Sequence, residues 1–350
     1  MKSNRHSFNP FAWRKIMTKQ ILTYSAARKF QVCHKAYHNR YLENLVPLEQ
    51  DDALFLGSII HECLELHYKE RASLAKINRN IDAAYPLKDS NDRQKRDWHL
   101  AKAMMKGYVE HYAKENIEVV ETELEFRIPI INPKTGRSSK SFELMGKVDG
   151  LVCMDGAYFI LEHKTAALIT GDYIEKLPLD FQINLYAMAL GKERQLPITG
   201  VIYNVIQKSK IRQKQGETEA QFEIRRQELI RKSKTGKTSA RRQMPESDTD
   251  FQKRLESVYS SPNMFARETL YLSDADIDRT KQELWEITQE ILDSRRRKHW
   301  SQNTDSCFRY YAPCMYFPLC RAHDNPNVKD NLYTKRPPHS ELSVGESKIF

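Results

Sequence analysis

The chain has 350 residues, of which 40% are hydrophobic, so it can bury a sizeable core and is not disordered over its whole length. Its 56 Lys and Arg residues outnumber its 46 Asp and Glu residues, and the resulting net charge of +10 favours an anionic partner such as a nucleic acid. No run approaches the roughly 20 consecutive apolar residues of a membrane span, and the basic N-terminus lacks the apolar segment of a signal peptide, so we expect a cytoplasmic protein.

The first predicted elements are helical. Residues 1–20 are expected to form a flexible leader. From 24 to 45, apolar and aromatic residues recur at three- and four-residue spacing, which predicts one amphipathic helix with Cys33 inside it. A second helix is predicted at 54–68, and a third, highly charged helix at about 89–114.

Three predicted strands follow these helices. Apolar residues alternate with charged ones at 124–130, and two further strands are predicted at 142–152 and 157–164. The dipeptide Asp155-Gly156 joins the last two strands as a two-residue hairpin turn. We therefore expect the three strands to be antiparallel neighbours.

The remaining elements complete an α/β pattern. A helix is predicted at 180–190, an apolar strand suited to the centre of a sheet at 201–206, and a long helix at 277–292. Strands and helices in this order predict an α/β fold with a mixed central sheet.

The chain is expected to divide into five parts along its length. These are the leader at 1–20, a core at 21–206 that includes Cys33, a basic helical insertion at 207–260, a C-terminal helix and cysteine group at 261–325, and a disordered tail at 326–350.

A pair of carboxylates is expected beside the hairpin turn. A two-residue turn sets the strand register, and in that register Asp149 lies opposite Glu162, with Cβ atoms about 5 Å apart. Facing carboxylates repel, so either one is protonated or a divalent cation such as Mg²⁺ or Mn²⁺ lies between them. Lys164 shares their face because it lies two residues beyond Glu162.

This combination of groups suits phosphodiester hydrolysis. A bound divalent metal lowers the pKa of a water molecule and offsets the charge of the transition state, and a lysine can orient that water. The alternative is a ladder of surface salt bridges, in which Glu162 pairs with Lys164 and Asp149 pairs with Lys147.

Four features of the sequence resemble the PD-(D/E)XK nuclease superfamily, and specifically its RecB-like exonuclease branch with an iron–sulfur cluster. Asp149 precedes Glu162-His163-Lys164 by twelve intervening residues, as in the signature of the superfamily. Residues 57–65 resemble the G-x3-H-x2-L-E helix of that branch, and Gln182 and Tyr186 resemble its Q-x3-Y motif. The order of three strands and a following helix also matches the family core.

The resemblance implies a fold and a metal site. The fold would be a restriction-endonuclease-like core, a mixed central sheet flanked by helices, with a helical periphery stapled by cysteines. His61, Asp149, Glu162 and the main-chain carbonyl of His163 would bind one or two Mg²⁺ or Mn²⁺ ions. Without the resemblance, His61 would be interpreted as a hydrogen-bonded core histidine.

The resemblance also implies roles for three further residues. Lys164 would position the attacking water, and Gln182 and Tyr186 would contact the DNA backbone or orient Lys164. The alternative is that Gln182 and Tyr186 only pack against the core and cap the helix.

Cys307, Cys314 and Cys320 fall within 14 residues, with spacing C-x6-C-x5-C. In a reducing compartment, clustered cysteines indicate metal ligands rather than disulfides. With Cys33 as a fourth thiolate, they are similar to the staple that holds a [4Fe–4S] cluster in the same branch, although the first C-terminal gap there is two residues rather than six. Tetrahedral zinc is the alternative occupant.

The basic insertion is expected to attract phosphate groups. Residues 207–242 contain twelve Lys and Arg residues against four Glu residues, a net charge of +8. The alternative is a solvated helix on which Glu residues pair with neighbouring cations. Gly236-Lys237-Thr238 is not a nucleotide-binding P-loop, because position 231 is Arg231 instead of the required glycine and no strand precedes it.

These observations favour a Mg²⁺- or Mn²⁺-dependent deoxyribonuclease. The resemblance implies an exonuclease of DNA recombination or repair, of the CRISPR-associated exonuclease or AddB nuclease-domain type, from a phage or prophage and acting with a recombination or annealing protein. One alternative is a CRISPR-adaptation exonuclease. Another is a non-catalytic DNA-binding scaffold that contains structural zinc.

Overall fold

The computed structural model describes residues 19–48, 52–86, 88, 90–309, 312–339 and 342. The described residues form a central six-stranded mixed sheet, so the predicted α/β architecture is confirmed. The strands follow the order β1-β4-β5-β6-β7, and β3 pairs with β4. Their bounds are β1 (Gln20–Leu22), β3 (Glu118–Ile131), β4 (Ser138–Met154), β5 (Ala157–Ala166), β6 (Ile198–Gln207) and β7 (Phe265–Tyr271).

The strand pairings follow from the sequence patterns. β3, β4 and β5 are antiparallel neighbours, as predicted. Gly150 lies opposite Leu161, the register that the Asp155-Gly156 turn predicts, and both turn residues have the positive φ angles that such a tight turn requires. The apolar strand β6 is central, because it lies parallel to β5 on one side and antiparallel to β7 on the other.

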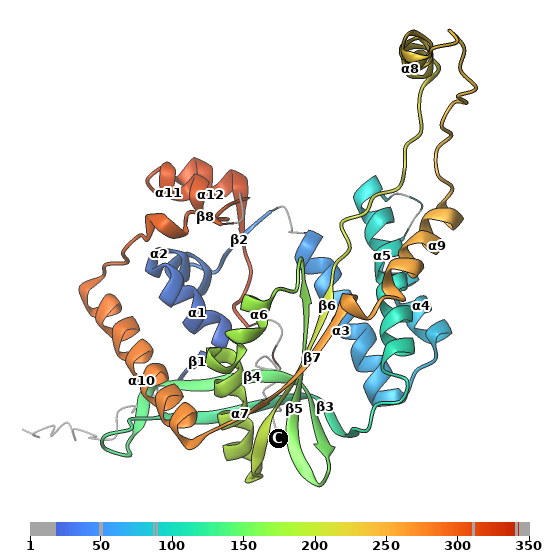
Figure 1. Ribbon diagram of the computed structural model, residues 1–350. Helices are drawn as coiled ribbons and strands as arrows, with labels where there is room; N and C mark the ends of the chain where they lie inside the picture. Colours follow the sequence, from blue (N-terminus) through green and yellow to red (C-terminus); the bar gives the residue numbers. More distant parts are fainter. Residues whose placement is uncertain are drawn as a thin grey trace, which may run out of the picture.

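Helices cover both faces of the sheet (Figure 1). One face packs against α1 (Tyr24–Val32), α7 (Phe181–Arg194) and α10 (Asp274–Arg297). The other packs against α3 (Asp52–Glu70), α4 (Leu74–Ala84), α5 (Asp92–His111) and α9 (Asp248–Tyr259). Since side chains alternate along a strand, Ile160 of β5 enters the first core while Phe159 and Leu161 enter the second.

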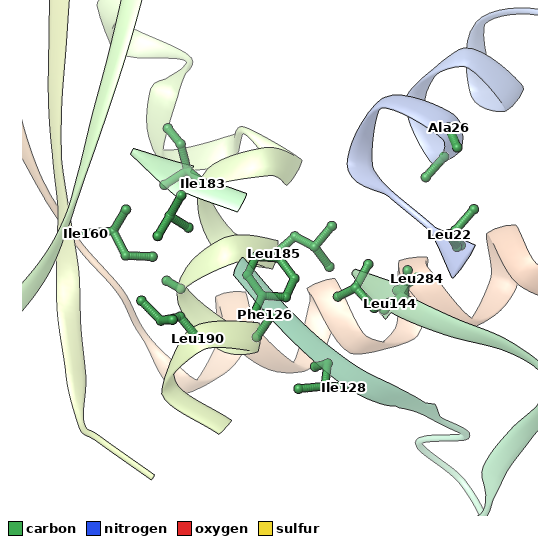
Figure 2. Packing of buried hydrophobic residues seen from close by; sticks show 14 of the residues in the cluster. Leu22, Ala26, Phe126, Ile128, Leu144, Ile160, Ile183, Leu185, Leu190 and Leu284 are labelled. Carbon is green, nitrogen blue, oxygen red and sulfur yellow. The ribbon is translucent and has the colours of Figure 1, made fainter. Parts of the chain in front are cut away.

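Figure 2 shows the first of these cores at close range. Phe126 of β3 and Ile160 of β5 lie near α7, and Leu284 of α10 and Leu144 of β4 belong to the same cluster. These residues are at most 3% exposed. The packing holds α7 firmly on the strands that carry the predicted acids.

The helix expected at 24–45 is interrupted, and Cys33 lies in the interruption rather than inside a helix. α1 ends at Val32, Cys33 has an extended backbone with φ −165°, and α2 (His34–Tyr37) and a π-helix, η1 (His38–Leu42), follow. A distant segment makes the break favourable. The Asn303 side chain donates to the Val32 carbonyl (3.0 Å), and the Lys35 N–H donates to the Ser301 carbonyl (3.0 Å), so the groups freed at both helix ends are satisfied.

The basic insertion is shorter than expected. Residues 208–247 form an arm that carries α8 (Glu219–Lys232) at its far end and projects from the body of the protein (Figure 1). Residues 248–259 instead form α9, whose Phe251, Leu255 and Tyr259 are buried in the second core. The assignment of α9 to the insertion was therefore wrong.

The C-terminal region is ordered well beyond residue 325. α12 (Pro326–Leu332) is followed by β10 (Tyr333–Lys335), which pairs antiparallel with β2 (Leu45–Pro47). The predicted disordered tail at 326–350 is therefore wrong for residues 326–335, while 340, 341 and 343–350 lie outside the described residues. At the other end of the chain, the leader prediction falls on 1–18, outside the described residues, and on Gln20, which begins β1.

Several short elements complete the described part of the chain. They are α6 (Gly171–Glu175), η3 (Leu177–Leu179), η4 (Pro262–Met264), η5 (Thr304–Ser306), β8 (Phe308–Arg309), β9 (Ala312–Pro313) and α11 (Phe317–Arg321). The elements β1, β7 and α4 are additions to those that the sequence predicts. None of the described helices is long and apolar enough to cross a membrane.

Candidate active site

Asp149 and Glu162 lie where β4 and β5 begin to separate. The ladder between these strands ends at the pair Gly150 and Leu161, so the two acids are the first residues beyond it. Glu162 is 4% exposed, whereas the Asp149 side chain is 18% exposed. The main-chain N–H of His163 donates to Asp149 Oδ2 at 2.7 Å, which holds this carboxylate against β5.

His61 reaches the same place from α3. Its Nδ1 lies 3.2 Å from Asp149 Oδ1, and its side chain is 30% exposed. One turn earlier, α3 passes close to β5, because a Cβ atom on Gly57 would lie 3.7 Å from the Thr165 hydroxyl. The four-residue spacing from Gly57 to His61 therefore directs the imidazole of His61 toward Asp149.

Glu162 has two partners of its own. The ammonium of Lys164 pairs with Glu162 Oε1, and Gln182 Nε2 donates to the same oxygen at 3.0 Å. Gln182 is fixed in the first turn of α7 because the Asp180 carboxylate caps that helix and accepts from the Gln182 N–H at 2.7 Å.

One half of the salt-bridge alternative is present, since Glu162 pairs with Lys164, but the other half is not. Lys147 pairs with Glu123 of β3 rather than with Asp149, and Glu162 is buried rather than on a solvated surface. The two acids and Lys164 therefore form a partly enclosed group beside the sheet.

The two carboxyl groups differ in protonation. Burial raises the pKa of Glu162 to about 7, against the opposing effect of Lys164. Burial also acts to raise the pKa of Asp149, but the neighbouring His61 and Lys164 lower it below its usual range. These opposite shifts keep Asp149 ionised and favour the protonated form of Glu162.

Tyr186 lies one helical turn after Gln182 and packs against the core. Its ring contacts Phe126 edge-on, with centroids 5.4 Å apart, and Tyr24 at 6.2 Å. Burial raises the pKa of its hydroxyl, as does the nearby Glu162 carboxylate, so the hydroxyl stays protonated. Tyr186 thus faces the Glu162 and Lys164 pair with a neutral hydrogen-bonding group.

A polar network behind the site was not predicted from the sequence. The Asn204 side chain on β6 lies 3.3 Å from His163 Nδ1, and Arg267 Nε on β7 donates to Asn204 Oδ1 at 2.5 Å. The available signal was Asn204, a polar residue inside the apolar run of a central strand. No feature of the sequence indicated the role of Arg267, because strand β7 itself was not predicted.

The carboxylate oxygens of the site are donors that hard divalent cations prefer, and the imidazole of His61 adds a nitrogen donor beside them. Burial raises the pKa of Glu162 and so disfavours its ionised form, which a bound cation would favour. Both carboxylates are occupied by protein partners in this arrangement. Among the described side chains, no three His, Cys, Asp or Glu residues are grouped so as to hold a metal ion.

The four cysteines come from both ends of the chain. Cys33, Cys314 and Cys320 pack against one small hydrophobic cluster, and the Cys314 N–H donates to the Cys307 carbonyl at 2.7 Å. All four are free and partly buried. Burial raises the pKa of the Cys320 thiol to about 11, and Cys314 and Cys33 are among the groups that raise it further. Within the described residues, these cysteines do not form a group of three or more ligating side chains that could hold a metal ion.

The other two cysteines lie elsewhere. Cys63 is buried in α3, where burial raises the pKa of its thiol to about 11, and Cys153 is near the end of β4. Cys63 packs in the second core as a small apolar residue would, whereas Cys153 is only partly buried.

Comparison with known proteins identifies the family. The crystal structure of a putative exonuclease from Eubacterium rectale, at 2.19 Å resolution, aligns with 98% of this chain and 100% of its own, with 10% sequence identity and a TM-score of 0.44, a similarity too low to carry an argument. Among curated proteins there is no match. A sequence model of the PD-(D/E)XK nuclease superfamily, however, matches residues 21–321, a span that contains both acids, Lys164 and the sheet that carries them. The chain belongs to the PD-(D/E)XK nuclease superfamily.

Proposed function

We propose that the protein is a Mg²⁺- or Mn²⁺-dependent deoxyribonuclease that hydrolyses phosphodiester bonds at Asp149, Glu162 and Lys164. The observation that carries this proposal is the grouping of two interacting carboxyl groups and an ammonium where β4 and β5 separate. Family membership supports it, since nucleases of this superfamily generally use divalent metals.

In this proposal, the metal ligands are Asp149, Glu162, His61 and the main-chain carbonyl of His163. A bound divalent ion would supply a water of lowered pKa and offset the negative charge of the transition state. The Lys164 ammonium, held beside Glu162, hydrogen-bonds the attacking water and orients it. Gln182 keeps Glu162 in place through its 3.0 Å hydrogen bond, and Tyr186 offers a neutral hydroxyl to the DNA backbone or to Lys164.

We further propose exonucleolytic action on DNA ends, in recombination or repair, with a recombination or annealing protein as partner. The support is the resemblance of residues 57–65, Gln182 and Tyr186 to the RecB-like exonuclease branch. The same resemblance underlies the proposal of a phage or prophage origin, and we also propose that the protein is cytoplasmic.

The test of nuclease activity uses end-labelled linear and circular DNA, single- and double-stranded, with Mg²⁺, Mn²⁺ or EDTA. The wild-type protein is expected to degrade linear DNA with either metal and to leave it intact in EDTA. Lys164→Met is expected to lower the rate at least about 100-fold, because it removes the group that orients the water.

Lys147→Met is the matched control. Lys147 is also a lysine on the central sheet and pairs with Glu123, but it lies outside the proposed site. Its rate is expected to stay within about threefold of wild type, since loss of a partly exposed ion pair changes little. A wild-type protein that leaves every substrate intact with Mn²⁺, or equal losses in the two variants, contradicts the proposal.

We also propose that Cys33, Cys307, Cys314 and Cys320 bind a [4Fe–4S] cluster. The four free cysteines are suitable donors in kind and come from both chain ends, and Lys29 interacts electrostatically with Cys33 and Cys314, as Lys35 does with Cys320. Protein purified without oxygen is expected to be brown, with broad absorbance near roughly 400 nm. Cys33→Ser is expected to lose that absorbance and Cys153→Ser to keep it, whereas a colourless protein containing zinc contradicts the cluster.

A further inference from the structure

The arm, residues 208–247, has a defined path. It leaves the end of β6 and returns into α9 as two extended segments that run side by side, with α8 between them (Figure 1). The Glu217 N–H donates to the Gln243 carbonyl (2.8 Å), and the Glu246 N–H donates to the Lys214 carbonyl (2.9 Å). Gly216, with φ +78°, permits the contact, because a Cβ atom there would meet the Pro245 nitrogen at 2.5 Å.

Two of its acids stabilise the arm from within. Glu217 pairs with Arg225 of α8, and Arg225 Nη2 also donates to the Arg241 carbonyl at 2.9 Å, which links α8 to the returning segment. Glu246 pairs with Arg254 of α9 at 2.6 Å and so fixes the base. Glu217 and Glu246 thus stabilise the conformation of the arm through ion pairs within the protein.

Most of the positive charge of the arm is unneutralised. Of the twelve Lys and Arg residues at 207–242, only Arg225 and Arg226 form ion pairs within the part of the chain that the structure describes. Six of the others lie within residues 231–242, which contain no acid, and all six are exposed. These six residues, here called the arm tip, are Arg231, Lys232, Lys234, Lys237, Arg241 and Arg242.

The arm begins next to the proposed active site. In the parallel pairing of β5 with β6, Lys164 lies opposite Val205 and Ala166 opposite Gln207. The N–H of Lys208, the first residue of the arm, donates to the Ala166 carbonyl at 2.7 Å. The arm therefore leaves the sheet at the end that carries Lys164, only two residues further along.

The length of the arm matches a repeat of duplex DNA. The eleven residues at 208–218 span at most about 36 Å when extended, at about 3.3 Å per residue. One turn of B-form DNA covers about 34–36 Å. The arm tip can thus contact phosphates about one helical turn away from the bond held at the site.

The composition of the arm favours phosphate contacts over other partners. Its single aromatic residue is Phe222, whereas surfaces that bind single strands stack bases on several aromatic rings. The exposed apolar residues of α8, Ile224 and Leu229, are five positions apart and so lie about 140° apart around the helix, which gives no continuous apolar face for a protein partner.

We propose that the arm grips duplex DNA, with the arm tip contacting backbone phosphates about one turn from the scissile bond. This rests on the proposed nuclease function and adds to it that the substrate is double-stranded on the side of the arm. Binding is electrostatic and independent of base sequence, because Lys and Arg side chains on an exposed arm contact phosphates rather than base edges.

The test compares two triple variants that remove the same charges. Lys234→Gln/Lys237→Gln/Arg241→Gln neutralises the arm tip. Lys134→Gln/Arg137→Gln/Lys140→Gln, the control, removes two lysines and one arginine at exposed positions in the turn between β3 and β4 and at the start of β4. Affinity for a labelled duplex of about 30 base pairs is measured by fluorescence anisotropy in EDTA at several salt concentrations, so that no cleavage occurs.

The arm-tip variant is expected to bind duplex at least about tenfold more weakly near 0.1 M salt, with the slope of log K against log[salt] smaller by about 2–3. The control is expected to bind as wild type does. A duplex of about 8 base pairs, too short to reach the arm tip, is expected to bind both variants equally. If the two triple variants bind the long duplex with equal affinity, the proposal is wrong. It is also wrong if the arm-tip variant changes its oligomeric state while its affinity for DNA is unchanged.

The two proposals fail separately. If the wild-type protein degrades DNA but the arm-tip variant binds the long duplex normally, the arm proposal is wrong and the nuclease proposal stands. If the arm-tip variant loses affinity but the wild-type protein cleaves no substrate, the arm proposal stands as a duplex-binding surface and the nuclease proposal is wrong.

Discussion

Arg267 of β7 connects α3, β6 and the loop that follows α5 behind the candidate site. Its Nη1 pairs with Glu115 at 2.7 Å, its Nη2 donates to the Tyr68 hydroxyl at 3.1 Å, and its Nε donates to Asn204. Since the Asn204 oxygen accepts from Arg267, its amide is left to donate to His163 Nδ1. Burial lowers the pKa of His163 to about 3, so its imidazole is a neutral acceptor.

Arg267 is therefore expected to act as a positioning residue for β5. Replacing it with Met leaves Glu115 without its cationic partner, and with only the Tyr68 hydroxyl at 3.2 Å among its partners in the described part of the chain, at a site where both ion-paired side chains are less than 20% exposed. The free energy of unfolding is expected to fall by about 2–4 kcal/mol, measured by urea denaturation. Arg226→Met is the control, because Arg226 pairs with Glu223 at 48% exposure and its loss is expected to change the free energy by less than about 0.5 kcal/mol. If both substitutions lower the free energy of unfolding equally, Arg267 does not have the proposed structural role.

At the scale of residues, the sequence predicts local relations and misses distant ones. The register of the hairpin is confirmed because a two-residue turn determines every pair that follows it, and the pair Gly150 and Leu161 obeys that rule. The contact between Arg267 and Asn204 joins residues 63 positions apart, and no local pattern marks it. The roles of His61, Gln182 and Tyr186 stay predictions, although the structure brings His61 beside Asp149 and Gln182 beside Glu162.

The contact between α5 and α9 depends on one glycine. A Cβ atom on Gly107 of α5 would lie 2.5 Å from the Tyr259 carbonyl oxygen of α9, a clash with backbone that cannot easily move. On α3, a Cβ atom on Gly57 would meet only the Thr165 hydroxyl, at an ordinary contact distance of 3.7 Å. A side chain is therefore excluded at Gly107 but would fit at Gly57.

The same substitution is expected to have opposite effects at these two positions. Gly107→Ala should lower the free energy of unfolding by about 1–3 kcal/mol, because overpacking exceeds the gain in helix propensity. Gly57→Ala should raise it by about 0.5–1 kcal/mol, because only the propensity term applies. Thermal and urea unfolding of both variants test this. A stabilised Gly107→Ala protein would show that α9 moves away from α5 at little cost.

At the scale of elements, the sequence predicts the core but not where tertiary contacts override a pattern. The strands β3 to β6 and the helix α7 follow from apolar periodicity and turn residues. The break at Cys33 does not follow from such local patterns, because the backbone groups that it frees are hydrogen-bonded by the distant residues Ser301 and Asn303. α9 was misassigned because it follows a charged segment, although its Phe251, Leu255 and Tyr259 have the spacing of a buried helical face.

On the scale of the whole molecule, the two ends of the described chain form one unit. β10 pairs with β2, Lys329 pairs with Glu43 at 2.7 Å, and the Tyr316 hydroxyl donates to the Leu45 carbonyl at 2.8 Å. Tyr316 is 1% exposed and stacks on Tyr333, with ring centroids 5.9 Å apart. The sequence predicted disorder here because residues 326–339 are mostly polar, and Tyr333 alone carries much of the apolar contact.

This arrangement predicts that removing the supposed tail opens the N-terminal segment. A chain that ends at Asn325 lacks α12 and β10, so Tyr316 loses the ring that covers it and β2 loses its partner strand. Exposing one large apolar side chain costs about 1.5–3 kcal/mol, which corresponds to roughly a 10- to 100-fold larger population of locally opened molecules. Trypsin cleavage after Lys35 or Arg40, followed by mass spectrometry, is expected to accelerate by that factor. A chain that ends at Leu342 keeps β10 and is expected to be cleaved at the full-length rate, so equal cleavage of the two truncated chains would contradict a stabilising role for the C-terminal strand.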